Sequence, residues 1–280
     1  MNISKTALAI SLKFNALRKQ QHIQHLIPYE IHQYYESVTF WHSNSRFFSP
    51  IKNLFINALL RIDEILLAGD LHHIIFRKLS VHTLTKAYLE RNPNGQIVVL
   101  GSGFDHLAWI FADRHPCFEL DVLPVIRQKQ AMIKQKRERL YFIEWDANND
   151  RLIESLNSCK HYNSQLPTLF ITEGLIDYLD RNVIRNLAAS IKKLNPKNEW
   201  LSTHFDREQL PLNHRISFEL GVRLAGEKLT KNVDATEFAK LCNSKSFHIK
   251  HKIYSNDRVI SKANGQPMSH MKGCSVLHLN

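Results

Sequence analysis

Long apolar runs are missing from this chain of 280 residues, although 44% of its residues are hydrophobic. No stretch of about 18 uncharged apolar residues occurs, which argues against a transmembrane helix. Residues 1–12 also lack the apolar centre and small-residue cleavage site of a secretory signal, so we expect a helix that stays on the mature protein. The length suffices to bury a sizeable core within one large domain.

Cysteine is scarce and widely spaced. The four cysteines form no C-x-x-C pair, which argues against a disulfide framework and against a cysteine-based zinc site. They are Cys117, Cys159, Cys242 and Cys274. We expect free thiols in the reducing cytoplasm and no bound metal.

Acidic residues are outnumbered, and the formal net charge is +11. Much of the excess lies in "RQKQAMIKQKRER", residues 127–139, where apolar side chains recur at helical spacing and predict basic side chains on the opposite, solvated face. No basic stretch is interleaved with aromatics as in single-strand binders, so we expect no nucleic-acid partner.

The first 95 residues are predicted to be helical. Ser4 or Thr6 caps a helix to about Gln21, and Pro28 begins a segment with several aromatic residues. Further helices are predicted after Pro50, where Gly69 is a plausible stop, and over residues 72–91. The aromatic residues are Tyr29, Tyr34, Tyr35, Phe40 and Trp41, and the apolar positions after Pro50 are Leu54, Ala58, Ile62 and Ile65.

After Gly95, short apolar runs alternate with segments of helical period, a pattern typical of an α/β sheet with mostly parallel strands. The last two runs have no long helix between them and predict an antiparallel hairpin. No linker divides the chain, so we expect a single domain, with residues 1–95 as a helical cap and 96–280 as the α/β core. The seven runs are 97–100, 117–120, 140–143, 168–172, 200–203, 247–254 and 275–279.

A glycine-rich turn follows the first run, in "IVVLGSGFDHLAWIFADRHPCFELD". Gly101 and Gly103 let a ligand approach the backbone, and the helix expected from about Asp105 would point free N–H groups toward the turn. Asp121 lies 20 residues after Gly101, at the end of the second run, where a carboxylate can accept hydrogen bonds from ribose hydroxyls. Turn and acid together predict a nucleoside ligand, although Asp121 could instead cap the next helix.

The identity of that nucleoside follows from charge. The dinucleotide fingerprint requires a third glycine where this chain has His106, and Asp105 would repel a pyrophosphate. S-adenosylmethionine carries no phosphate, and its sulfonium and ammonium groups favour nearby carboxylates. The turn therefore suits S-adenosylmethionine better than NAD.

Three segments resemble the leucine carboxyl methyltransferase-like family. They are "VVLGSGFDHLAWIF", "FELDVLPVIRQKQ" and "LPTLFITEGLIDYLD", and "GDLHHIIFRK" is similar to the segment before the family's first strand. The likeness runs from about Gly69 to Leu194 and is nearer to the bacterial branch of small-molecule O-methyltransferases. It implies a Rossmann-like class I methyltransferase fold: a seven-stranded, mostly parallel sheet with an antiparallel last strand and an N-terminal helical extension.

The resemblance also implies a binding site for S-adenosylmethionine. Arg77 matches the arginine that pairs with the methionine carboxylate, and the turn of Gly101, Ser102 and Gly103 lies beside the methionine part. The matching acids are Asp105 near the ammonium, Asp121 at the ribose, Asp146 near adenine and Glu173 at the amino-acid end. Structural roles stay open: Arg77 on the surface, and Asp105 and Asp146 as caps. A buried Glu173 without a ligand or arginine contact would be costly.

A hydroxyl acceptor would need a base, whereas a carboxylate acceptor would not. Candidates are His204, Tyr178, Asp206 and His106, which replaces the family's usual Thr or Ser; ordinary structural roles remain open for each. We expect the N-terminal helices and their aromatics to cover the cofactor and form much of the acceptor pocket. An apolar or anionic small molecule would suit it.

The predicted function is O-methylation of a small-molecule carboxylate or hydroxyl. A protein carboxyl methyltransferase and a cofactor- or partner-binding domain without chemistry remain alternatives. A nucleic-acid base methyltransferase is disfavoured, because "TEGL" stands where such enzymes carry N/D-P-P-Y/F.

Overall fold

The structure is a computed structural model that describes residues 5–38, 58, 60–149 and 151–280. Its α-helices are α1 (Lys5–Leu17), α2 (Gln21–Gln24), α3 (Tyr29–Ser37), α5 (Asp70–Arg91), α6 (Leu107–Phe111), α7 (Leu123–Met132), α8 (Leu152–Asn157), α9 (Arg181–Leu194), α10 (Leu212–Leu224) and α11 (Ala235–Asn243). Residues 60–66 are helical as well. Short 3-10 turns are η2 (Ile176–Tyr178), η3 (Arg207–Gln209) and η4 (Ser255–Asp257).

Seven strands form one sheet in the order β3-β2-β1-β4-β5-β7-β6. They are β1 (Gln96–Leu100), β2 (Cys117–Asp121), β3 (Leu140–Glu144), β4 (Thr168–Thr172), β5 (Glu199–Phe205), β6 (Ile249–Tyr254) and β7 (Cys274–Leu279). The first five pair in parallel, and β7 runs antiparallel between β5 and β6. All seven predicted strands, the mostly parallel sheet and the antiparallel last strand are confirmed.

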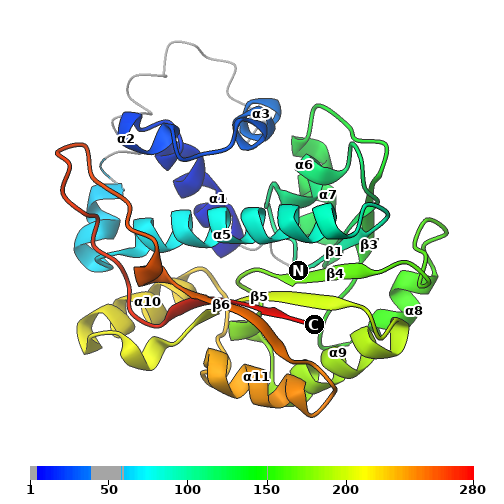
Figure 1. Ribbon diagram of the computed structural model, residues 1–280. Helices are drawn as coiled ribbons and strands as arrows, with labels where there is room; N and C mark the ends of the chain where they lie inside the picture. Colours follow the sequence, from blue (N-terminus) through cyan, green and yellow to red (C-terminus); the bar gives the residue numbers. More distant parts are fainter. Residues whose placement is uncertain (1–4, 39–57, 59, 150) are drawn as a thin grey trace.

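The sheet is covered on both faces, which explains why its central strands are almost continuously apolar. Alternate residues of β1 point to opposite layers: Ile97 and Val99 pack in the cluster beneath α5 and α6, and Val98 and Leu100 in the cluster beneath α8, α9 and α11. Figure 1 shows α5 crossing one face of the sheet, with α9 and α11 on the other. The predicted apolar stripe of α9 is core, as expected: Ile184, Leu187, Ala188 and Ile191 are buried.

The N-terminal helices differ in detail from the expectation. The first helix ends at Leu17, before Gln21, and Thr6 lies inside it instead of capping it. Of the positions expected to form a stripe after Pro50, Ala58, Ile62 and Ile65 are exposed. The buried apolar residue of this helix is Leu60, which the expected stripe did not include. Gly69 has a φ of 95° and directly precedes α5. Several named positions lie outside the described residues: Ser4, Phe40, Trp41, Pro50 and Leu54.

None of the described helices combines the length and the apolar character that crossing a bilayer requires. All four cysteines are free thiols, and three of them are buried.

One basic residue of α7 contradicts the expected solvated face. Lys129 is buried, and its Nζ lies 2.5 Å from Oε2 of the equally buried Glu119 on β2. Burial raises the pKa of Glu119 to about 7, against the opposing effect of Lys129. Helical spacing could not reveal this pair, because the partner carboxylate comes from a neighbouring strand.

We therefore expect Lys129→Met to lower the free energy of unfolding by about 3 kcal/mol, because it leaves a buried carboxyl group without its cation. Urea denaturation followed by circular dichroism measures this change. Lys134→Met is the control, since Lys134 is exposed in the same basic segment, and its effect should stay within about 0.5 kcal/mol. Equal effects of the two substitutions would contradict the role of the buried pair.

Candidate active site

The glycine turn after β1 has the backbone geometry that requires glycine. Gly101 has a φ of 64° and Gly103 a φ of 48°, both in the left-handed region that side chains disfavour. The Gly101 N–H donates to the Leu120 carbonyl at 2.8 Å, which ties the turn to the end of β2. The turn therefore presents its backbone at the carboxyl end of the sheet, where open α/β sheets place ligands.

Asp121 closes this turn from β2. Its Oδ2 accepts from the Gly103 N–H and its Oδ1 from the Val122 N–H, each at 2.8 Å. Burial raises the pKa of Asp121, and the two N–H groups oppose that change. The residue that precedes α7 is Val122, so Asp121 does not take the helix-capping role that its position in the sequence left open.

Two cations of α5 meet two carboxylates at the ends of β1 and β4. Arg77 Nε and Lys78 Nζ each lie 2.8 Å from Glu173 Oε1, and Lys78 also pairs with Asp105. All four side chains are at most 11% exposed. We call these residues the charge cluster: Arg77, Lys78, Asp105 and Glu173. The expectation that a buried Glu173 contacts an arginine is confirmed.

Ion pairing within the charge cluster shifts the pKa values of Lys78 and Asp105 in the direction that keeps both groups ionised despite burial. Burial alone would lower the pKa of Lys78, but Asp105 and Glu173 together raise it above its usual value. Burial would likewise raise the pKa of Asp105, whereas Lys78 holds it well below the usual range. The Leu107 N–H also donates to Asp105 Oδ1 at 2.7 Å. Asp105 thus accepts a backbone N–H at the start of α6 and also pairs with Lys78. Helix α6 begins at Leu107, two residues later than predicted.

Asp146 lies in the loop after β3. Its Oδ1 accepts from the Asn148 N–H at 2.9 Å and its Oδ2 from the Asn149 side-chain amide at 2.7 Å. These bonds stabilise the loop, which is the structural role that the sequence left open, and the same residue also faces a cavity.

All eight residues that the sequence singled out for cofactor binding line one cavity of about 580 Å³, which we call the first cavity. They are Arg77, Gly101, Ser102, Gly103, Asp105, Asp121, Asp146 and Glu173. The strands bring these residues together because parallel strands end at the same edge of the sheet. Sequence reasoning missed Lys78, and it missed the lining contributed by Ser11 of α1 and by Glu227 and Lys228 after α10.

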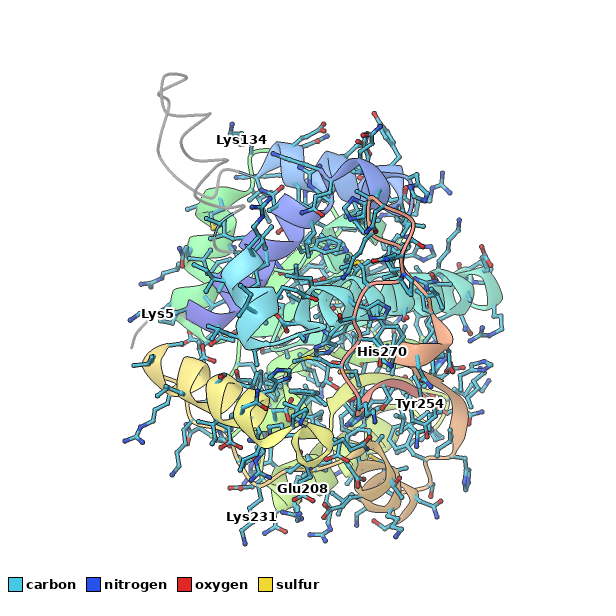
Figure 2. All side chains as sticks on the ribbon, turned by 90° about the vertical axis from the view of Figure 1, so that its left-hand side faces the viewer. Lys5, Lys134, Glu208, Lys231, Tyr254 and His270 are labelled. Atoms are coloured by element: carbon cyan, nitrogen blue, oxygen red, sulfur yellow. The ribbon has the colours of Figure 1, made fainter. Side chains whose placement is uncertain are left out.

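A second cavity of about 380 Å³ adjoins the first. It lies among α1, α5 and α10, and its walls include Ile10, Ile74, Phe205 and Phe218. The two cavities share seven lining residues: Lys5, Thr6, Ile10, Arg77, Gly174, Tyr178 and Ala225. Figure 2 looks onto this side of the molecule, with the labelled Lys5 at the start of α1 and the yellow α10 below it.

The helical N-terminal part reaches these cavities only through some of its residues. Helix α1 lines both, as expected for a cover. The aromatic Tyr34 and Tyr35 of α3 line neither; they pack around His106 with ring centroids 6.0 and 5.7 Å away. The expected aromatic lid over the site is therefore wrong for α3.

Both histidines proposed as bases belong to the core and line neither cavity. His106 is buried and stacks on Phe14, and His204 packs against Phe238 with ring centroids 4.4 Å apart. Burial lowers the pKa of each to about 3, so both rings are neutral. Position at a strand end did not predict the direction of these side chains.

The other two catalytic candidates have different surroundings. Asp206 accepts from the Glu208 N–H at 3.1 Å and from the Asn232 amide at 2.7 Å, so it stabilises η3 and lines neither cavity. Tyr178 lines both cavities, and burial raises the pKa of its phenol well above the usual range. Of the four candidates, Tyr178 alone lies at the junction, by which we mean the residues that line both cavities.

The sequence model of the leucine carboxyl methyltransferase family matches residues 67–192. This part of the chain is similar to that family. The match contains the charge cluster, the glycine turn, Asp121 and Asp146, and the chain is an S-adenosylmethionine-dependent methyltransferase. It ends before β5, α10 and the last two strands. No curated protein matches this chain at a significant level.

Solved methyltransferases share the fold. A Thermobifida fusca protein assigned to the methyltransferases is 13% identical, with a TM-score of 0.56 over 80% of this chain and 86% of that chain. Human N-acetylserotonin methyltransferase in complex with S-adenosylmethionine is 14% identical over 96% of this chain and 65% of that one, with a TM-score of 0.48. The glycopeptide N-methyltransferase MtfA with sinefungin is 12% identical over 71% and 85%, with a TM-score of 0.47. The first likeness shows the class I methyltransferase fold, and the other two are too distant to support an argument.

We expect the charge cluster to depend on Lys78. Lys78→Met leaves Asp105 without its buried cation and Glu173 with Arg77 only, so the free energy of unfolding should fall by about 3–5 kcal/mol. Urea titration measures it, with Lys86→Met as the control because Lys86 lies exposed on the same helix. A Lys78 variant as stable as the control would show that the cluster does not hold α5 to the sheet.

Proposed function

We propose that the first cavity binds S-adenosylmethionine and that the second cavity binds a small molecule whose carboxylate or hydroxyl oxygen receives the methyl group. The observation that carries this proposal is the junction of the two cavities at Arg77, Gly174 and Tyr178. A donor and an acceptor bound on either side of one junction can be held in line, and such positioning supplies much of the catalysis of a displacement.

The charge cluster suits the amino-acid end of the donor. It holds two cations and two carboxylates, so it is neutral as a whole. A zwitterion brings no net charge to such a wall: its carboxylate faces Arg77 and Lys78, and its ammonium faces Asp105 and Glu173. Arginine adds a planar, forked donor that fits a carboxylate.

The nucleoside end fits the opposite wall of the first cavity. Asp121 already accepts two backbone N–H groups, and a carboxylate can accept from ribose hydroxyls as well. Asp146 accepts hydrogen bonds from amide groups, which is the chemistry that the exocyclic amine of adenine offers. Gly101 and Gly103 allow the ligand to approach the backbone between these two ends.

A small acceptor fits the size and the walls of the second cavity. Its volume of about 380 Å³ lies near the lower end for small-molecule sites. Apolar side chains from α1, α5 and α10 line it and would exclude water from the reacting atoms, so an apolar compound would suit them. The free thiols support a cytoplasmic setting.

Cofactor binding can be tested without knowing the acceptor. We expect wild-type protein to bind S-adenosylhomocysteine in calorimetry and Asp121→Ala to bind it at least about tenfold more weakly, because the ribose loses its acceptor. Glu144→Ala is the matched control: Glu144 pairs in register with Asp121 on the next strand but is exposed. Unchanged affinity of the Asp121 variant, or no wild-type binding at millimolar ligand, would contradict the assignment.

The acceptor class can be tested by following the methyl group. With donor labelled in the methyl group and a cell extract separated into small molecules and proteins, we expect label in the small-molecule fraction. Heat-inactivated protein is the control. Label that accumulates in protein instead would favour the carboxyl methylation of a protein.

A further inference from the structure

The second cavity contains a carboxylate that the proposed donor site does not use. Building on the proposed function, we propose that this cavity takes a neutral hydroxyl compound and that Asp177 accepts the hydroxyl proton. Asp177 lies in η2, three residues after Gly174, and lines the second cavity but not the first. The next residue, Tyr178, lines both, so Asp177 stands beside the junction where the acceptor oxygen would meet the methyl group.

The backbone holds Asp177 firmly in this position. Its carbonyl oxygen accepts from the Thr230 N–H at 2.9 Å and from the Thr230 hydroxyl at 3.1 Å. The same hydroxyl reaches the Leu179 carbonyl at 3.1 Å, so the segment after α10 fixes both sides of η2. The side chain thus projects from a rigid support, as a base requires.

The carboxylate of Asp177 differs from the other carboxylates of this cavity. Asp63 and Asp70 both pair with Lys13 Nζ, at 2.5 and 2.9 Å. Asp177 makes no side-chain hydrogen bond or ion pair among the described residues, although Arg77 and Arg207 lie near enough to act on its charge. Those two cations are engaged elsewhere, by Glu173 and by the Thr230 carbonyl respectively. A partly buried carboxylate that lacks a hydrogen-bond donor from the protein favours a ligand that supplies such a donor.

A hydroxyl is the acceptor group that best matches this carboxylate. It donates a hydrogen bond to Asp177 and directs an oxygen lone pair outward, and its hydrocarbon body packs on Ile10, Ile74 and Phe218. A carboxylate acceptor would place a second negative charge beside Asp177, and like charges at close range are unfavourable. Of the nearby cations, Lys13 already pairs with Asp63 and Asp70, and Arg77 pairs with Glu173 and is assigned to the donor.

The transfer balances with these groups alone. The hydroxyl oxygen forms a bond to the methyl carbon while the carbon–sulfur bond breaks. The electron pair of the broken carbon–sulfur bond stays on sulfur. The hydroxyl proton passes to the Asp177 carboxylate and leaves to solvent with the products. No oxidant, reductant or metal takes part in this balance.

The pKa of Asp177 fits that role. Burial raises it to about 6, against the opposing charges of Arg207 and Arg77. The carboxylate is therefore ionised above about pH 6 and able to accept a proton, and it becomes protonated as the pH falls below that value. The other charged or titratable groups that line the cavity are Lys5, Lys13, Asp63, Asp70, His73 and Tyr178. Of these, Asp63 also has a pKa raised by burial to about 6, whereas burial lowers that of His73 to about 3.

The test compares two probes of matched shape, para-cresol and para-toluate, by calorimetry on protein saturated with S-adenosylhomocysteine. At about pH 8 we expect the wild type to bind the neutral cresol at least about tenfold more tightly than the anionic toluate. Asp177→Asn should reduce this preference to within about threefold by admitting toluate, because it removes the repelling charge. Asp177→Glu, which keeps the charge, should keep the preference.

Lowering the pH provides the same test without substitution. At about pH 5 the wild type should bind toluate at least about fivefold more tightly than at about pH 8, whereas Asp177→Asn should show little change. A similar gain in Asp177→Asn would assign the effect to Asp63 and overturn the proposal. Toluate binding to the wild type as tightly as cresol at about pH 8, or no binding of cresol at millimolar concentration, would overturn it too.

Affinity for S-adenosylhomocysteine separates this proposal from the one on which it rests. Asp177→Asn should bind it within about twofold of the wild type, since Asp177 does not line the first cavity. Failure of the wild type to bind would refute the donor site itself. A purely structural role for Asp177 would change the melting temperature in both variants and leave the preference between the probes intact.

Discussion

Four buried charges at the end of the sheet set the geometry on which the site depends. Arg77 and Lys78 come from one turn of α5, whereas Asp105 and Glu173 follow β1 and β4. A buried charge is costly unless a partner compensates it. Displacing any one of the four side chains would therefore leave another buried charge without its partner. The cluster therefore fixes α5 across the carboxyl edge of the sheet and holds two carboxylates at a set distance beside the glycine turn. It also gives the first cavity a polar wall without net charge, which suits a zwitterionic ligand.

The same arrangement separates the two cavities chemically. Arg77 lines both, but its guanidinium is engaged by Glu173, so its charge is directed toward the first cavity. Lys13 is likewise shared between Asp63 and Asp70. The second cavity combines apolar walls with several charged groups, and Asp177 is a carboxylate there that has no partner within the described part of the chain. Ion pairing thus gives the proposed donor side matched charges and leaves Asp177 on the proposed acceptor side without a paired cation.

The sheet could be predicted from the sequence because its signals are local. Buried parallel strands appear as short apolar runs, and Asp121 stands at a fixed spacing from Gly101, so the strands and the glycine turn with its acid follow from the pattern. The other predicted residues of the first cavity followed from the resemblance to the family. Ion pairs between distant elements left no such signal. From the sequence alone, Lys129 and Lys78 resemble exposed surface lysines. In the structure Lys129 pairs with Glu119 of β2, and Lys78 pairs with Glu173, which follows β4. The prediction that His106 or His204 acts as a base was wrong for a related reason. The sequence indicates where the backbone of each histidine lies, but the direction of the ring depends on packing against Phe14 or Phe238.

The family match covers the two cavities unequally. The matched residues, 67–192, contain the whole charge cluster and every residue predicted to bind the donor, and all of these residues line the first cavity. The second cavity draws most of its lining from elsewhere, above all from α1 and α10. A family relationship cannot specify chemistry that lies outside the matched segment. Asp177 lies inside that segment yet lines the cavity whose walls come mostly from outside it. A group placed beside its unpaired carboxylate is favoured when it can donate a hydrogen bond, so under the proposed function this side chain constrains the acceptor.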